Sequence, residues 1–438
     1  MDQPVPQGSR SMKHHSTSTS WWRALGPGLL YAGAAVGVSH LVQSTRAGAN
    51  FGLVLIWAIV LSNAIKYPFF EYGPRYAAAT KKSLLDGYRN IGPWALWLFV
   101  LMTLSTMWII LASITSVTAG LAIQLTGWVL PGWQWSGLLL LACMLILGIG
   151  RYRLLDRLMK IIIITLTVTT VVAVVAALFG DVPKKEEFKT VFSLADAGHI
   201  AFLVALIGWM PAPIDIAVWH SVWSTAKIRT TGVAPSLKEA LLDFKVGFWG
   251  TALLAVCFVS LGAMILYGTG ETPHPKAAVF AGQLIQLYTT SIGQWATLFI
   301  TVAAFTTMFS TTLTVFDAFP RILRRASQLL VPSLSQDEQH PGLYWGWIAI
   351  TGLGSVGLLA YFGLAQHTPI TMKGLVDLAT TISFLTAPVL AYLNFRAVTN
   401  EEVPEAQRPG PFLRALSWFG LVALTGFTGY YLWITFMP

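Results

Sequence analysis

Long apolar runs separated by short polar segments occupy the chain from about residue 27 to its end. A membrane-spanning helix needs about 20 mostly apolar residues, because the hydrocarbon core of a bilayer is about 30 Å thick. About eleven runs have a suitable length, and the expected spans are residues 27–47, 51–76, 94–124, 134–150, 157–180, 197–225, 246–267, 292–317, 342–364, 372–395 and 411–436. The pattern predicts an all-α polytopic membrane protein with about 11 transmembrane helices, and a short helix over 275–290 outside the membrane core.

Two of the apolar runs contain residues that interrupt a helix. The first covers residues 26–40, with a Gly-Pro-Gly start and Gly37 further on; the second covers residues 202–215 and contains Pro211 and Pro213. Proline removes a backbone donor, and in lipid a broken helix is tolerated only where it lines a cavity or is buried in protein. Two such segments at matching positions of two halves are typical of secondary transporters with a substrate site near the bilayer midplane.

The two interruptions also divide the chain. Five expected spans precede the second broken helix and five begin with it, which predicts a 5+5 inverted repeat with broken helices 1 and 6. The expected boundaries are a flexible N-terminal tail over 1–20 and a transmembrane transporter domain over 21–438, divided into a first repeat 27–180, a second repeat 197–397 and an extra helix 411–436.

Composition and charge support a membrane protein and suggest its orientation. Hydrophobic residues make up 55% of the chain and charged residues 11%, whereas about a quarter of an ordinary soluble domain is charged. Seventeen Lys and Arg residues lie in loops on the side of the N-terminus and six lie on the other side. Because cytoplasmic loops are enriched in Lys and Arg, we expect an integral protein of a bacterial inner membrane with a cytoplasmic N-terminus and an external C-terminus. The net charge of +9 therefore reflects topology, and no nucleic-acid partner is expected.

Motifs of soluble enzymes are absent from the sequence. It contains no Gly-x-Ser-x-Gly, no His-Glu-x-x-His and no Walker motif. Cys143 and Cys257 lie inside apolar runs and are expected to be packed thiols. We therefore expect no enzyme and no cofactor. The expected partners are the lipid bilayer and a small-molecule or ion substrate; the oligomeric state stays open.

Several runs resemble the Nramp family of divalent metal-ion transporters, which have a LeuT-type fold. The stretch from Gly26-Pro27-Gly28 to Phe51-Gly52 resembles the first helix of that family. Met210-Pro211 and His220-Ser221 resemble motifs of its sixth helix, and the Ser/Thr-rich run 305–317 resembles its eighth. The resemblance implies a LeuT-type 5+5 repeat and alternating access around the two broken helices.

The sequence departs from this family at the metal ligands. The first-helix signature of the family is Asp-Pro-Gly-Asn, and the aligned residues here are Gly37, Val38, Ser39 and His40. In the sixth helix the family's histidine corresponds to Ala212 when the alignment starts from Met210, and to Asp215 when it starts from the following His-Ser pair. The carboxylate ligand of the first helix is thus missing.

The candidate site follows from the two interruptions and from this alignment. The expected substrate-binding residues are Gly37, Ser39, His40, Met210, Ala212 and Asp215. If a metal binds, its ligands would be His40, Met210 and Asp215, a soft set that suits late transition ions. Asp215 and His220 could together respond to protons, since an ionisable group within a span is a functional candidate by default.

These residues favour a secondary transporter that does not carry manganese or iron(II). Either a metal-ion carrier with altered ligands or a carrier of a small organic or non-metal solute fits the sequence; a sensor built on a transporter scaffold lacks an output domain. Residues 94–121 and 343–363 contain no Asp, Glu, Lys, Arg or His. The third and ninth helices of the resembled family carry such groups, so we expect no proton coupling along that route.

Overall fold

The computed structural model describes residues 26–149, 152–180, 190–334, 340–364 and 371–437. The expected tail over 1–20 lies outside the described residues. Helices of the first half are α2 (Pro27–Ala35), α3 (Thr45–Phe51), α4 (Ile56–Thr80), α5 (Leu84–Ile91), α6 (Pro93–Thr126), α7 (Gly132–Gly148) and α8 (Tyr152–Phe179). Those of the second half are α9 (Ala197–Gly208), α10 (Ile216–Thr231), α11 (Leu237–Ile265), α12 (Ala277–Ile292), α13 (Thr297–Leu330), α14 (Pro341–Leu364), α15 (Met372–Val398) and α16 (Pro411–Phe436).

The helices confirm the predicted polytopic architecture. Over the described residues they form eleven spans when α2 with α3, and α9 with α10, are each counted as one broken span and the shorter helices α5 and α12 are left out. Within the part of the chain that the structure describes, six helices are by themselves long and apolar enough to cross a membrane: α6, α11, α13, α14, α15 and α16. The interruptions in the first and sixth spans fall where the glycines and prolines predicted them, as in a LeuT-type 5+5 repeat.

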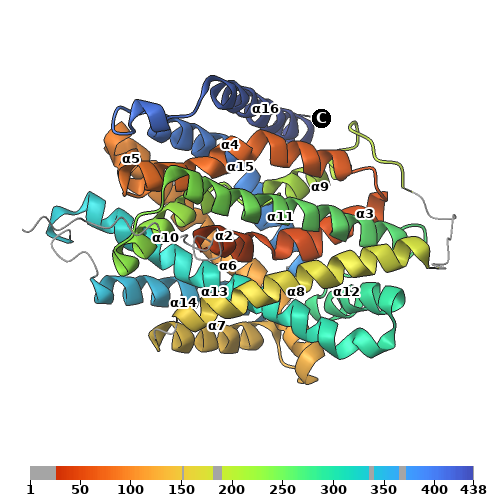
Figure 1. Ribbon diagram of the computed structural model, residues 1–438. Helices are drawn as coiled ribbons and strands as arrows, with labels where there is room; N and C mark the ends of the chain where they lie inside the picture. Colours follow the sequence, from red (N-terminus) through yellow and green to blue (C-terminus); the bar gives the residue numbers. More distant parts are fainter. Residues whose placement is uncertain (1–25, 150–151, 181–189, 335–339, 365–370, 438) are drawn as a thin grey trace, which may run out of the picture.

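The spans pack in two groups that meet at the broken helices. One group consists of α2, α4, α10 and α11, and the other of α6, α7, α13 and α14, while α15 contacts α4, α6 and α9. Figure 1 shows the long helices running side by side, with α16 at one margin and α7 at the other. The C-terminus lies at the end of the molecule opposite α5 (Figure 1).

Two glycines allow the first broken helix to pack closely against α11. A Cβ at Gly48 would lie 2.1 Å from the carbonyl oxygen of Val259, and a Cβ at Gly262 would lie 2.3 Å from that of Thr45. No side chain fits at either position, because real Cβ contacts are longer than 3.0 Å. Small residues at such crossings let helix backbones approach in membranes.

The helix α5 was not predicted from the sequence. It is only eight residues long and begins with a capping box. The Ser83 backbone N–H donates to Asp86 Oδ2 at 3.0 Å, and the Ser83 hydroxyl donates to the same atom at 2.6 Å. This Ser-x-x-Asp spacing is a helix-start signal that was available in the sequence.

Candidate functional site

The first broken span loses its α-helical pattern after α2 and resumes as one π-helical turn, Ser39–Ser44. Thr311 of α13 lies at this point, with its Oγ1 3.0 Å from the carbonyl oxygens of Gly33 and Val36. Gly37 permits this approach, because a Cβ there would lie 2.8 Å from the methyl carbon of Thr311. The threonine hydroxyl thus compensates a carbonyl that the break leaves without a helical partner.

His40 joins the first break to α11. Its Nε2 lies 3.0 Å from the carbonyl oxygen of Thr251, and its Nδ1 lies 2.8 Å from the hydroxyl of Ser39. A carbonyl only accepts hydrogen bonds, so Nε2 carries a proton, and in the neutral ring Nδ1 then has the lone pair. The side chain is fully buried, and both ring nitrogens are engaged. In this conformation the imidazole holds two helices together and does not present a free nitrogen to a ligand.

The second break separates α9 from α10, and two side chains of α4 bind its free carbonyls. The Ser62 hydroxyl donates to the carbonyl oxygen of Met210 at 2.8 Å. The Lys66 ammonium donates to the carbonyl oxygen of Ile207, and to those of Gly208 and Met210 at 3.2 Å each. The three ammonium protons therefore meet three carbonyls at the C-terminal end of a half-helix, where the helix dipole favours positive charge.

Sequence reasoning missed Lys66, although the signal was present. The lysine is fully buried and lies inside the expected span 51–76. A charged residue at membrane depth usually faces the protein interior and pairs with carbonyls or other charges. The apolar residues on both sides of Lys66 predict the span but do not indicate which groups the lysine binds.

A small cavity lies between the two breaks. Its volume is about 20 Å³, and polar or aromatic side chains in its lining come from both breaks and from α13. These are Ser39, Trp209, Trp219 and Thr311. The remaining lining residues are apolar, so the cavity combines an apolar surface with a few hydroxyl and indole groups, as small-molecule sites do.

A second cavity of about 10 Å³ adjoins the first and shares Ile110 and Pro213 with it. Asp215 lines this smaller cavity together with hydroxyl-bearing residues of α6 and α15, which are Thr103, Thr106, Ser383 and Thr386. Asp215 is 8% exposed, and its Oδ1 has no hydrogen-bond partner among the described residues. The carboxylate is therefore aimed at the cavity without a protein partner for that oxygen.

The six expected substrate residues thus have three kinds of position. Ser39 and Asp215 each line one of the two cavities. Gly37 allows the contact with Thr311 described above, and the other three, His40, Met210 and Ala212, are buried beside the breaks without lining either cavity.

His220 does not face Asp215. Its ring lies 6.0 Å from the ring of Tyr31 and 6.1 Å from that of Phe244, and it lines a separate cavity of about 340 Å³ between α2, α4, α10 and α11. Five residues along an α-helix correspond to a rotation of about 140°. The two side chains therefore contact different neighbours, and the structure does not bring them together as a pair.

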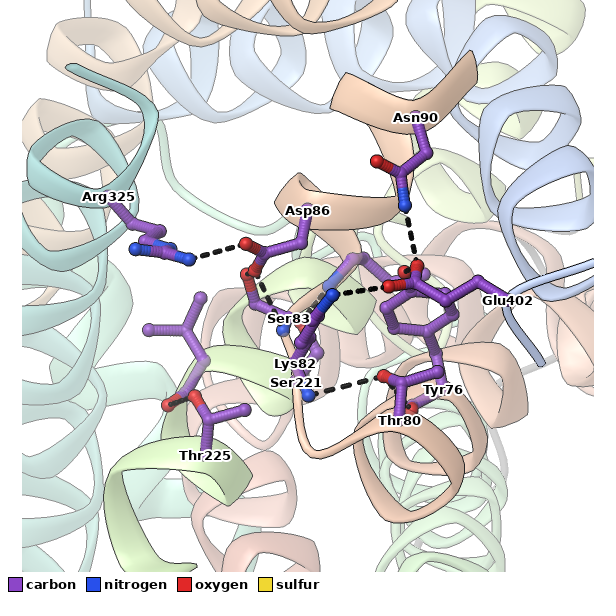
Figure 2. Close-up of polar contacts among 12 residues, drawn as sticks. Tyr76, Thr80, Lys82, Ser83, Asp86, Asn90, Ser221, Thr225, Arg325 and Glu402 are labelled. Carbon is purple, nitrogen blue, oxygen red and sulfur yellow. Dashed lines mark hydrogen bonds and ion pairs between the residues drawn. The ribbon is translucent and has the colours of Figure 1, made fainter. Parts of the chain in front are cut away.

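Ser221 has a structural contact at the end of the molecule near α5. Its hydroxyl oxygen accepts a hydrogen bond of 2.9 Å from the backbone N–H of Leu84. Figure 2 shows this residue in a polar cluster. In this cluster Asp86 binds Arg325 of α13, and Glu402 accepts hydrogen bonds from Lys82 and Asn90. The His-Ser motif of the sixth helix thus ties α10 to the start of α5.

Comparison with known proteins identifies the family. The Nramp family pattern, described as natural resistance-associated macrophage protein-like, matches residues 28–434. An uncharacterized protein of Pasteurella multocida is 37% identical over 418 residues, which cover 94% of this chain and 92% of that protein.

Two solved structures show the same fold. The Eremococcus coleocola manganese transporter, bound to an aromatic bis-isothiourea compound, matches with a TM-score of 0.69 and 14% identity, over 97% of this chain and 87% of its own. MhsT in complex with L-phenylalanine matches with a TM-score of 0.64 and 14% identity, over 94% of this chain and 98% of its own. At such identities the likeness concerns the fold alone. Through the family pattern, which spans almost its whole length, the chain belongs to the Nramp family.

Proposed function

We propose that this protein is a secondary transporter that works by alternating access around its two breaks, and that its cargo is not manganese or iron(II). The family and the LeuT-type fold support the transport role. In this mechanism the group of α2, α4, α10 and α11 moves against the group of α6, α7, α13 and α14. The two small cavities lie where these groups meet.

The observation that carries the cargo proposal is the position of the Lys66 ammonium. Carbonyls exposed at a broken helix are natural ligands for a cation, and here Lys66 binds those of Ile207, Gly208 and Met210. When it is protonated, the Lys66 amine at this place also repels a divalent ion. At the first break Gly37 replaces the carboxylate of the resembled family, and the ring of His40 is engaged elsewhere.

The favoured cargo is a small organic or other non-metal solute. The cavity between the breaks has indole groups from Trp209 and Trp219 and hydroxyls from Ser39 and Thr311. Such a lining suits a molecule with an apolar part and one or two polar groups. Because the cavity has a volume of only about 20 Å³, movement of the two helix groups must enlarge it before a solute binds.

A metal-ion carrier with altered ligands is the second candidate. Membership of the family and the likeness to a manganese transporter favour it. Its ligands would be His40, Met210 and Asp215. For this role His40 must release Thr251 or Ser39 to free a ring nitrogen.

We also propose that transport is not coupled to protons along the family's usual route, since residues 94–121 and 343–363 contain no Asp, Glu, Lys, Arg or His. The proposed location is a bacterial inner membrane with the N-terminus in the cytoplasm, on the basis of the Lys and Arg distribution.

A binding screen on purified protein tests the cargo. Thermal unfolding is followed by tryptophan fluorescence with Mn²⁺, Fe²⁺, Cu⁺ and a panel of small amines, amino acids and carboxylic acids. We expect an organic solute to raise the unfolding temperature and to accumulate in proteoliposomes, and Mn²⁺ and Fe²⁺ to have no specific effect. Saturable Mn²⁺ stabilisation that Asp215→Asn abolishes would favour the metal carrier instead.

A further inference from the structure

The carboxylate of Asp215 is buried at the second break, and one of its two oxygens lacks a hydrogen-bond partner among the described residues. Its Oδ1 has no hydrogen bond among the described residues, and the residue is more than nine-tenths buried. It lies directly before α10, where the positive end of the helix dipole helps a negative charge. The free-energy cost of desolvating a buried ion is larger than the stabilisation that the helix dipole gives. A positive partner would therefore stabilise the carboxylate, and none of the residues lining its cavity is Lys, Arg or His.

The hydroxyls around Asp215 offer lone pairs to the cavity. The Thr106 hydroxyl donates to the carbonyl oxygen of Met102 at 2.9 Å, and the Thr386 hydroxyl donates to that of Ser383 at 3.1 Å. Each hydroxyl has a single proton, so the proton is used inside its own helix and the oxygen is left as an acceptor.

Ser383 of α15 contributes another oxygen atom to the cavity lining. Its hydroxyl oxygen accepts a hydrogen bond of 2.7 Å from the indole N–H of Trp209, which fixes the position of that oxygen beside the second break. The polar groups that line the cavity are thus a carboxylate and hydroxyl oxygens from α6 and α15, beside apolar residues that include Met102. Oxygen ligands such as these suit hard cations.

The charge and the volume limit which cation fits. The cavity has a volume of about 10 Å³, which is close to the space that one water molecule needs. Asp215 is the one carboxylate in its lining, so a divalent ion would leave an uncompensated positive charge in a medium of low dielectric constant. The carbonyls on the other side of the break are bound to Lys66 and do not add to the site.

We propose that Asp215 and the hydroxyls of Thr103, Thr106, Ser383 and Thr386 bind one singly charged alkali cation of the sodium type. The site joins the second break to α6 and α15. A bound ion would therefore connect α10, and with it the group of α2, α4, α10 and α11, to α6 and α15. The role as a coupling ion rests on the proposed transport function. The binding itself does not, because it is measured without any cargo.

The test is thermal unfolding of the purified full-length chain in detergent. NaCl is exchanged for choline chloride at constant ionic strength and mildly alkaline pH, where an ordinary carboxyl group is ionised. We expect the unfolding temperature to rise saturably with Na⁺. Asp215→Asn should remove this rise, and it should unfold at a higher temperature than the native chain in choline chloride, because it removes a buried unpaired charge. Thr386→Val should raise the Na⁺ concentration that gives half of the full response by about tenfold, because one oxygen contact is lost.

Asp196→Asn is the matched control. Asp196 occupies the equivalent position before α9, but its side chain is 53% exposed, so this variant should keep the full Na⁺ response. If Li⁺, Na⁺ and K⁺ leave the native chain unchanged, or if Asp215→Asn responds as the native chain does, the site does not exist. If the Asp215 carboxyl group is protonated and binds no cation, Li⁺, Na⁺ and K⁺ will leave the unfolding temperature of the native chain unchanged. A Na⁺ response without transport of any solute would contradict the proposed function and leave the site standing.

Discussion

Arg46 and Asp377 form a two-point ion pair between the first broken span and α15. Arg46 Nη1 lies 2.5 Å from Asp377 Oδ1, and Nη2 lies 3.0 Å from Oδ2. The arginine side chain is 4% exposed and the aspartate side chain 34%. Gln43 supports the pair by accepting from Arg46 at 2.6 Å and donating to Asp377 at 3.1 Å. Arg46 belongs to α3, the second part of the first broken span, and Asp377 belongs to α15, which contacts both helix groups. The ion pair therefore holds α3 against α15.

Removing either member of this pair should destabilise the protein. We expect a coupling of about 1–2 kcal/mol between Arg46 and Asp377, which lies between the values for exposed and buried pairs. The measurement is a double-mutant cycle with Arg46→Met, Asp377→Asn and both, followed by tryptophan fluorescence on heating. The double variant should unfold no earlier than the worse single variant. Strictly additive effects would show that the two charges do not stabilise each other.

Gly262→Ala should disrupt the packing of α11 against the first broken helix. The new Cβ would lie 2.3 Å from the carbonyl oxygen of Thr45, and two backbones must separate to admit it. We expect a loss of about 3 kcal/mol, the upper end of the cost of overpacking, seen as a lower unfolding temperature and poor yield. Gly250→Ala is the control in the same helix, because nothing lies within 4 Å of its Cβ. That change should be neutral or stabilise by up to about 1 kcal/mol, and equal effects of the two variants would contradict the packing.

The positions of the breaks were predictable because their causes are local. Gly37, Pro211 and Pro213 disturb helical hydrogen bonding wherever the chain folds, and apolar length sets the number of spans. The i,i+4 pair of Glu71 and Arg75, at 2.6 Å, is likewise local. The partners of the buried polar groups were not predictable in this way. His40 binds Thr251, which is 211 residues away, and no periodicity in the sequence encodes such a contact.

Acidification should weaken the polar cluster in Figure 2. Burial raises the pKa of Glu402, but hydrogen bonds from Lys82, Tyr76 and Asn90 outweigh burial and hold this pKa below its ordinary value of 4.5. A lowered pKa means that the stabilising contribution is present above about pH 4.5 and is lost as the pH falls through the folded-state value. We expect the unfolding temperature to fall over this window, and Glu402→Gln to reduce that fall. The exposed Glu271→Gln serves as the control, since its acid response should match that of the native chain.

Lys66→Met tests whether the ammonium stabilises the second break. Methionine has a similar length and no donor, so the carbonyls of Ile207 and Gly208 would lose their ammonium contact. Relief from burying a charge offsets part of this loss, and we expect a net destabilisation of about 2 kcal/mol because unpaired buried acceptors cost about 1–3 kcal/mol each. Ser62→Ala removes one donor to Met210 from the same helix and should cost about 1 kcal/mol. The free energies come from reversible unfolding in mixed detergent micelles, followed by tryptophan fluorescence. A Lys66→Met protein as stable as the native chain, with Ser62→Ala less stable, would mean that the ammonium is not the group that holds this break.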